Sequence, residues 1–149
     1  MKVAVCISGQ FRFYDATVRS IKEHLIEPYD CDVFCCFSND KSNNYDKFTC
    51  DNLPSDESVI TKIKDAFGSR VKDIKIITSE FSVKTGGSFA SDQKLCIEEY
   101  GNVHPRNLKV ELCDELRRKY QEENNFNYDV VVSIRSDFLF TEKFVIILI

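Results

Sequence analysis

Four short apolar runs separated by longer amphipathic stretches set the pattern of this chain. They cover residues 3–7, 33–37, 73–78 and 130–134. The first, second and fourth runs are rich in apolar or β-branched residues and end abruptly in small polar or charged ones. Runs of this length and character are typical of buried strands that deliver a loop to the edge of a parallel sheet.

The stretches between the runs carry helical periodicity. After the first run, Val18, Ile21 and Leu25 recur at helical spacing, which predicts a helix of about three turns with Pro28 beyond its end. Residues 55–68 predict a second helix that Ser55 or Ser58 caps and Gly68 ends. A long tract interrupted at 100–105 predicts two further helices, the second with an apolar face made of Leu108, Leu112, Cys113, Leu116 and Tyr120.

The alternation of strands and helices defines the expected fold class. It predicts one α/β domain over residues 1–149 with a Rossmann-like, mostly parallel sheet and helices on both faces. Ligands of such sheets bind outside the carboxyl ends of the strands. Polar residues after the runs should therefore meet at one edge.

The composition of the chain limits the kinds of partner that it is expected to bind. The chain has 149 residues, of which 43% are hydrophobic, so it can bury an ordinary core. Its formal charge of -4 and its dispersed basic residues argue against nucleic acid as a partner. The opening apolar run is too short for a secretory leader, and the run at 144–149 is too short to span a membrane. The expected location is the cytoplasm, that of the host cell if the source is a virus.

The chain contains seven cysteines. Their odd number and the lack of a leader argue against a disulfide framework, and their spacings do not match those of zinc sites. We expect reduced, mostly buried thiols that serve as small core residues.

Three polar segments are predicted to converge at the carboxyl edge of the sheet. The first contains Ser8, Gly9 and Gln10 with Arg12 close behind. There Gly9 allows a tight turn and Arg12 can pair with phosphate or carboxylate. The same residues could equally form a simple strand-to-helix turn. The second segment is 38–40, with Asn39 and Asp40.

The third segment, 135–137, follows the fourth run directly. Arg135 and Asp137 must emerge at the edge, because burying two charges costs too much. Asp137 could hold Mn²⁺ or Mg²⁺ together with phosphate oxygens. Alternatively, Arg135 and Asp137 form a surface ion pair that ends the strand.

Three stretches together resemble a known family. "KVAVCISGQFR", "DVFCCFSND" and "LRRKYQEENNFNYDVVVSIRSDFLF" are similar to glycosyltransferases of large DNA viruses and bacterial surface-polysaccharide loci, in which "CISGQxR" and "YDxVxxxRxDxxF" recur. The resemblance covers most of the chain, although residues 41–103 match only in layout. It implies a GT-A type fold that binds a nucleotide-sugar over the carboxyl edge of the sheet, with a divalent cation held by a DxD-type motif.

The resemblance also assigns roles to residues. It implies that Asp137 matches the metal-binding acid and that Ser8, Gly9, Gln10 and Arg12 match the nucleotide loop. Arg135 stands where the family has its first acid, so it is itself a candidate for contact with the diphosphate. The family pattern does not continue after residue 142, and 143–149 resemble a truncated or frameshifted tail or a lone edge strand.

The expected function is therefore transfer of a hexose from a nucleotide-sugar donor to an unknown glycan or protein acceptor. No catalytic base can be assigned. A non-catalytic remnant that binds nucleotide, or an interaction domain, is the alternative. A receiver-like domain fits less well, because the acids are not grouped as in a phospho-acceptor pocket.

Overall fold

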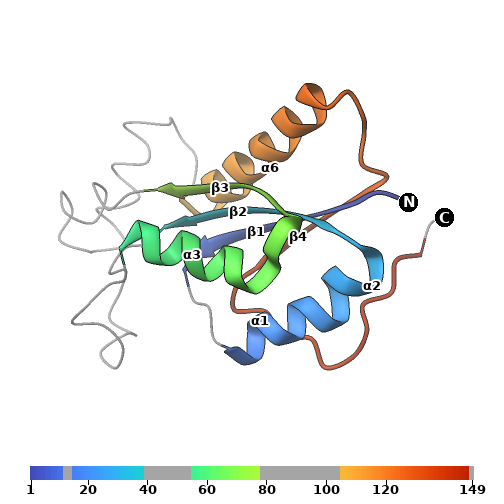
Figure 1. The fold of residues 1–149 in the computed structure, drawn as a ribbon, viewed down its shortest axis with the longest axis horizontal. Coiled ribbons are helices and arrows are strands. Elements are labelled where there is room, and N and C mark those ends of the chain that lie inside the picture. The colour runs from blue at the N-terminus through green and yellow to red at the C-terminus, as the bar shows by residue number, and fades with distance from the viewer. Residues whose placement is uncertain (12–14, 39–54, 78–104, 148–149) are drawn as a thin grey trace.

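A four-stranded parallel sheet forms the centre of the molecule (Figure 1). The computed structural model describes residues 1–11, 15–38, 55–77 and 105–147. The strands are β1 (Val3–Gln10), β2 (Asp32–Ser38), β3 (Val71–Ile77) and β4 (Val130–Arg135). Their order across the sheet is β3-β2-β1-β4, so the α/β class expected from the sequence is confirmed.

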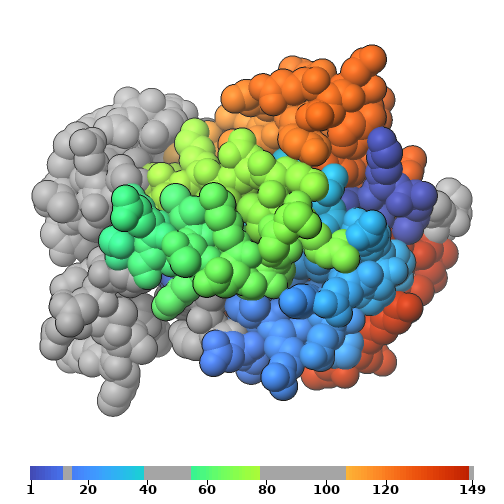
Figure 2. Space-filling model, in the orientation of Figure 1, coloured from blue at the N-terminus to red at the C-terminus, as the bar shows by residue number. Residues whose placement is uncertain are grey.

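The helices lie on both faces of this sheet. One helical stretch consists of α1 (Asp15–Ile21), a π-helical turn η1 (Lys22–Ile26) and α2 (Glu27–Tyr29). It is followed by α3 (Asp56–Phe67), the short 3-10 helix η2 (Gly68–Arg70) and α6 (Pro105–Glu123). The space-filling view places α3 and β3 between α6 above and α1 with α2 below (Figure 2).

The face of the sheet that carries α1, which we call the α1 face, holds the larger core. Val3, Val5 and Ile7 of β1 point into it, together with alternate residues of β2. The buried side chains from the helices that pack on this face are Ile21, Leu25, Ile26, Val59, Ile63 and Phe67. Ser55 caps α3 as expected, since its hydroxyl accepts a hydrogen bond from the Ser58 N–H at 3.2 Å, and Gly68 ends the helix with a φ of 59°.

The opposite face, which we call the α6 face, is covered by one described helix. Ala4, Cys6, Phe34 and Cys36 pack there against the predicted apolar face of α6, of which Leu108, Leu112 and Cys113 are buried. Phe34 also makes edge-on ring contacts with Tyr120 and Tyr128. The central strands β1 and β2 are therefore buried on both sides, as their uninterrupted apolar runs indicated.

Pro28 does not lie beyond the first helix, contrary to the sequence-based expectation. The helical stretch continues through Tyr29, with Pro28 in the first turn of α2. Proline has no N–H, so it cannot donate to the carbonyl of His24 four residues earlier. The Phe144 N–H donates to that carbonyl instead, at 3.0 Å.

The C-terminal segment 138–147 is not a strand but packs along this helical stretch. The Tyr29 hydroxyl donates to the Phe144 carbonyl at 2.7 Å and accepts from the Ile146 N–H at 3.1 Å. Ser20 makes the same two kinds of bond with the backbone of Phe140, at 2.7 and 2.6 Å. Phe140, Phe144 and Ile146 pack against the α1-face core, and the alternative of a lone edge strand is wrong for the described residues 143–147.

The described cysteines are core residues, as expected. Cys6, Cys31, Cys35, Cys36 and Cys113 are free thiols and buried. Burial raises the pKa of the Cys31 thiol to about 12 and that of Cys36 to about 11. Cys50 and Cys96 lie outside the described residues.

Candidate functional site

The strand order defines where a ligand site is expected. From β1 the chain moves outward to β2 and then β3, and later returns to the other side of β1 as β4. The direction of the connections therefore reverses between β1 and β4. In open parallel sheets the crevice outside the carboxyl ends of two such strands is the usual ligand site.

The first predicted segment lies at this point, but its geometry differs from the prediction. Ser8, Gly9 and Gln10 belong to β1 and pair with Cys36, Phe37 and Ser38 of β2, so they are not a loop. Ser8 is buried, and only the end of the strand reaches the surface. Gly9 has a φ of 130°, a backbone value that residues other than glycine rarely adopt, but it lies within β1 and not in the predicted turn.

The end of β1 is joined to the segment after β4 by one hydrogen bond. The Ser136 hydroxyl donates to the Gln10 carbonyl at 3.0 Å, and Ser136 is 2% exposed. Sequence reasoning placed both segments at one edge, and the structure brings them into contact. This bond fixes the position of Arg135 and Asp137, the two neighbours of Ser136.

Arg135 and Asp137 bind each other. Arg135 Nε donates to Asp137 Oδ1 at 2.8 Å and Arg135 Nη2 to Asp137 Oδ2 at 2.5 Å, a two-point guanidinium–carboxylate pair. This hydrogen bonding raises the pKa of Arg135, which stays positively charged at any physiological pH. The Arg135 side chain is 49% exposed, so the outer part of the guanidinium faces solvent.

The described residues do not form a prepared metal site. No group of three or more His, Cys, Asp or Glu side chains suited to a metal ion occurs among them. Both oxygens of Asp137 already accept hydrogen bonds from Arg135. A cation with one protein carboxylate and phosphate oxygens as its other ligands is chemically reasonable, and at Asp137 it would share the carboxylate with Arg135.

The Ser38 hydroxyl is a candidate ligand contact that the sequence-based prediction did not include. Its hydroxyl is buried at the carboxyl end of β2, opposite Gln10, and has no hydrogen-bond partner among the described residues. Leaving a buried hydroxyl unpaired is costly, so this group is a candidate for a hydrogen bond to a ligand that reaches the end of β2. The sequence signal was present, since Ser38 is the first polar residue after the second run, but the predicted contacts were Asn39 and Asp40.

Three other predicted contacts, Arg12, Asn39 and Asp40, lie outside the described residues.

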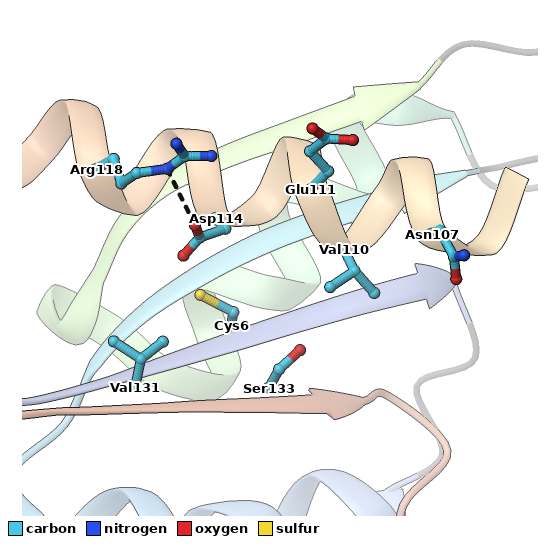
Figure 3. Close-up of a pocket in the computed structure, with 8 residues that line it drawn as sticks. All are labelled: Cys6, Asn107, Val110, Glu111, Asp114, Arg118, Val131 and Ser133. Atoms are coloured by element: carbon cyan, nitrogen blue, oxygen red, sulfur yellow. Dashed lines mark ion pairs between the residues drawn. The ribbon is translucent and has the colours of Figure 1, made fainter. Parts of the chain in front are cut away.

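A second feature is a groove between α6 and β4 (Figure 3). It has a volume of about 400 Å³ and exists because α6 covers β1 and β2 but leaves the α6 side of β4 open. Figure 3 shows the Cys6 sulfur at its floor and an ion pair between Arg118 and Asp114, 3.0 Å long, on its α6 wall. The remaining lining residues are Asn107, Val110, Glu111, Val131 and Ser133.

Comparisons with protein-family models, curated proteins and solved structures found no match to this chain. No helix in the described ranges has both the length and the apolar character that a bilayer crossing requires.

Proposed function

We propose that this α/β domain binds a nucleotide-sugar at the crevice between β1 and β4 and transfers its hexose to a glycan or protein acceptor in the cytoplasm. The observation that carries the proposal is the meeting of Gln10, Ser136, Arg135 and Asp137 where the direction of the connections between the described strands reverses. The motif resemblance supports the choice of donor.

In this proposal the chain acts by binding and fixed charge. Arg135 is permanently charged, partly exposed and oriented by Asp137, so it can stabilise the negative charge that develops on a departing nucleoside diphosphate. The Ser38 hydroxyl supplies a hydrogen bond at the neighbouring strand end. The proposal assigns no catalytic base.

The proposal retains Mn²⁺ or Mg²⁺ at Asp137 as a second source of positive charge. When bound there, the cation would neutralise diphosphate oxygens. Every other part of the proposal depends only on residues of the chain.

A second candidate function, a nucleotide-binding or interaction domain without turnover, is favoured by the Arg135–Asp137 pair itself. The two charges neutralise each other in the absence of a ligand, as expected for an ion pair that simply ends a strand.

Calorimetric titration with UDP- and GDP-sugars, with and without Mn²⁺, tests these alternatives on the native protein, Asp137→Asn and Arg135→Gln. If Asp137 holds the cation, Asp137→Asn should weaken Mn²⁺-dependent binding by about tenfold to a hundredfold, the equivalent of about 1.5 to 3 kcal/mol.

Each other result has a defined meaning. Binding that does not depend on Mn²⁺ but is weaker in Arg135→Gln would mean that Arg135, without a cation, binds the diphosphate. Binding without release of hexose in the presence of acceptor glycans would favour the second candidate. No binding of any nucleotide-sugar by the native protein would contradict both nucleotide-binding readings.

A further inference from the structure

The two edge strands of the sheet differ in how they are protected from pairing with another strand. An edge strand carries unpaired backbone N–H and C=O groups, and proteins usually blunt it with lysines, inward charges or bulges. β3 has such protection, with Lys72, Asp73 and Lys75 within its seven residues and a register irregularity against β2.

β4 has none of these devices along most of its length. Its sequence is VVVSIR, so the strand has no proline and no charged residue before Arg135 at its end. Among the described residues it pairs only with β1. Val131 is 43% exposed and lines the open groove beside α6.

We propose that the free edge of β4 pairs antiparallel with β4 of a second copy of this chain, about a two-fold axis that passes beside Val132. The inference rests on this edge and does not require nucleotide-sugar binding, although Arg135 takes part in both proposals. The result is one continuous sheet of two domains, with the α6 helices of both copies on the same side of it.

The side-chain pattern is self-complementary in this register. Directly opposed residues of an antiparallel pair point to the same face. With Val132 opposite Val132 of the second copy, Val131 faces Ser133 of that copy on the α6 face, and Val130 faces Ile134 on the α1 face. The apolar α1 faces of the two strands therefore lie on the same side of the joined sheet, and so do their open α6 faces.

Charge complementarity selects the second copy as the occupant. Asp129 precedes β4 and is 57% exposed, and Arg135 ends it at 49% exposed. In the proposed register each Asp129 stands opposite Arg135 of the other copy, so the two-fold axis generates two opposite-charge pairs. Within its own chain Asp129 accepts a hydrogen bond from the Lys2 N–H at 2.6 Å and lies 4.0 Å from the terminal amine, while the hydrogen bonds to Asp137 use only two of the five N–H groups of Arg135.

The first experiment is sedimentation of the purified protein from about 5 µM to about 1 mM, because one strand pair forms a small interface of modest affinity. We expect a reversible monomer–dimer equilibrium. Val131→Lys places a charge on the edge and should weaken dimerisation at least about tenfold. Val145→Lys is the matched control on a residue that is 66% exposed in the C-terminal segment, and it should leave dimerisation unchanged.

The second experiment tests the register with complementary charge reversals. Asp129→Lys and Arg135→Asp should each abolish self-association, because like charges then face each other. An equimolar mixture of the two variants should recover a one-to-one heterodimer, since the introduced lysine of one variant then opposes the introduced aspartate of the other. Circular dichroism of each variant establishes that it is folded.

Three results would overturn the proposal. A monomer throughout the concentration range would exclude the dimer. Dimerisation that survives Val131→Lys, or that Val145→Lys disrupts equally, would place the interface elsewhere. Failure of two folded charge variants to associate would reject the register in which Asp129 faces Arg135.

Discussion

Among the described residues, three segments of chain cover the α1 face of the sheet, whereas a single helix covers the α6 face. On the α1 face, the α1–α2 stretch, α3 and the C-terminal segment all contribute apolar side chains to one core. On the α6 face, α6 alone covers β1 and β2. The difference is clearest at β4, whose residues alternate between half-buried on the α1 face and exposed on the α6 face.

Because of this difference, the larger core and the open surfaces lie on different faces of the sheet. The α1 face holds the strands through the apolar core that has more buried residues among those described. The narrower cover on the α6 face leaves the groove and the edge of β4 open. The candidate ligand crevice lies at neither face but at the carboxyl ends of the strands that both faces hold in place.

The largest expected effect is a loss in the free energy of unfolding at alkaline pH. It depends on buried thiols that lie on the two faces of the sheet. Burial raises the pKa of Cys35 on the α1 face well above its ordinary value of 9.0, whereas the pKa of Cys36 on the α6 face rises to about 11, because Lys75 and Lys109 partly offset burial. The folded state keeps these protons when the unfolded state has lost them. Stability is therefore fully present below pH 9.0 and falls as the pH rises toward the folded-state values.

Urea denaturation between pH 8 and pH 11 measures this loss. Each pH unit above the ordinary thiol pKa removes about 1.4 kcal/mol for every thiol that stays protonated only in the folded state. Alkylation followed by peptide mapping should modify Cys36 before Cys35. Equal alkylation of both thiols would contradict the predicted difference between the faces. A stability that stays constant up to pH 11 would contradict the raised pKa values themselves.

Much of the fold could be predicted from the sequence, because short apolar runs and helical spacing are local signals. The order of neighbouring residues was enough to predict the four strands, the Ser55 cap and the apolar face of α6. The predicted end of β1 was wrong, because Ser8 to Gln10 extend the strand by pairing with β2. No local signal in the sequence indicates that pairing. The course of residues 138–147 likewise depends on Pro28 and Tyr29, more than a hundred positions away.

The candidate site was predicted in location but not in its contacts. The sequence placed 8–10 and 135–137 at one edge, because both follow buried runs. It left open whether Asp137 holds a cation or pairs with Arg135, since that choice depends on side-chain rotamers. The buried hydroxyl of Ser38 became notable only when the structure showed no partner for it among the described residues.

A smaller effect is expected from Tyr29→Phe, which tests the C-terminal segment as part of the α1-face cover. The substitution removes one donor and one acceptor and leaves the Phe144 carbonyl and the Ile146 N–H without this partner. We expect a loss of about 1 to 2 kcal/mol in the free energy of unfolding, and faster proteolysis within 138–147.

Tyr128→Phe is the matched control on the α6 face. It loses one hydrogen bond, to Asp32 at 2.7 Å, and the Asp32 carboxylate keeps Lys72 at 3.2 Å. This variant should not speed proteolysis of the C-terminal segment. Equal protease sensitivity of both variants would mean that the Tyr29 bonds do not hold that segment in place.

The smallest effect compares Val132→Ala with Val131→Ala, two identical substitutions at adjacent positions of β4. Both remove the same two methyl groups and the same β-branched preference for the strand, so only the cover on each face differs. Val132 packs against the α1-face core, and its truncation should cost about 1 kcal/mol. Val131 is 43% exposed above the groove, and its truncation should cost less than about 0.5 kcal/mol. Urea denaturation at low micromolar concentration keeps the chain monomeric, so that an association through the edge of β4 does not add to either value. Equal costs would mean that the α6 side of β4 is packed as well as its α1 side, and the groove would then not be an open surface in solution.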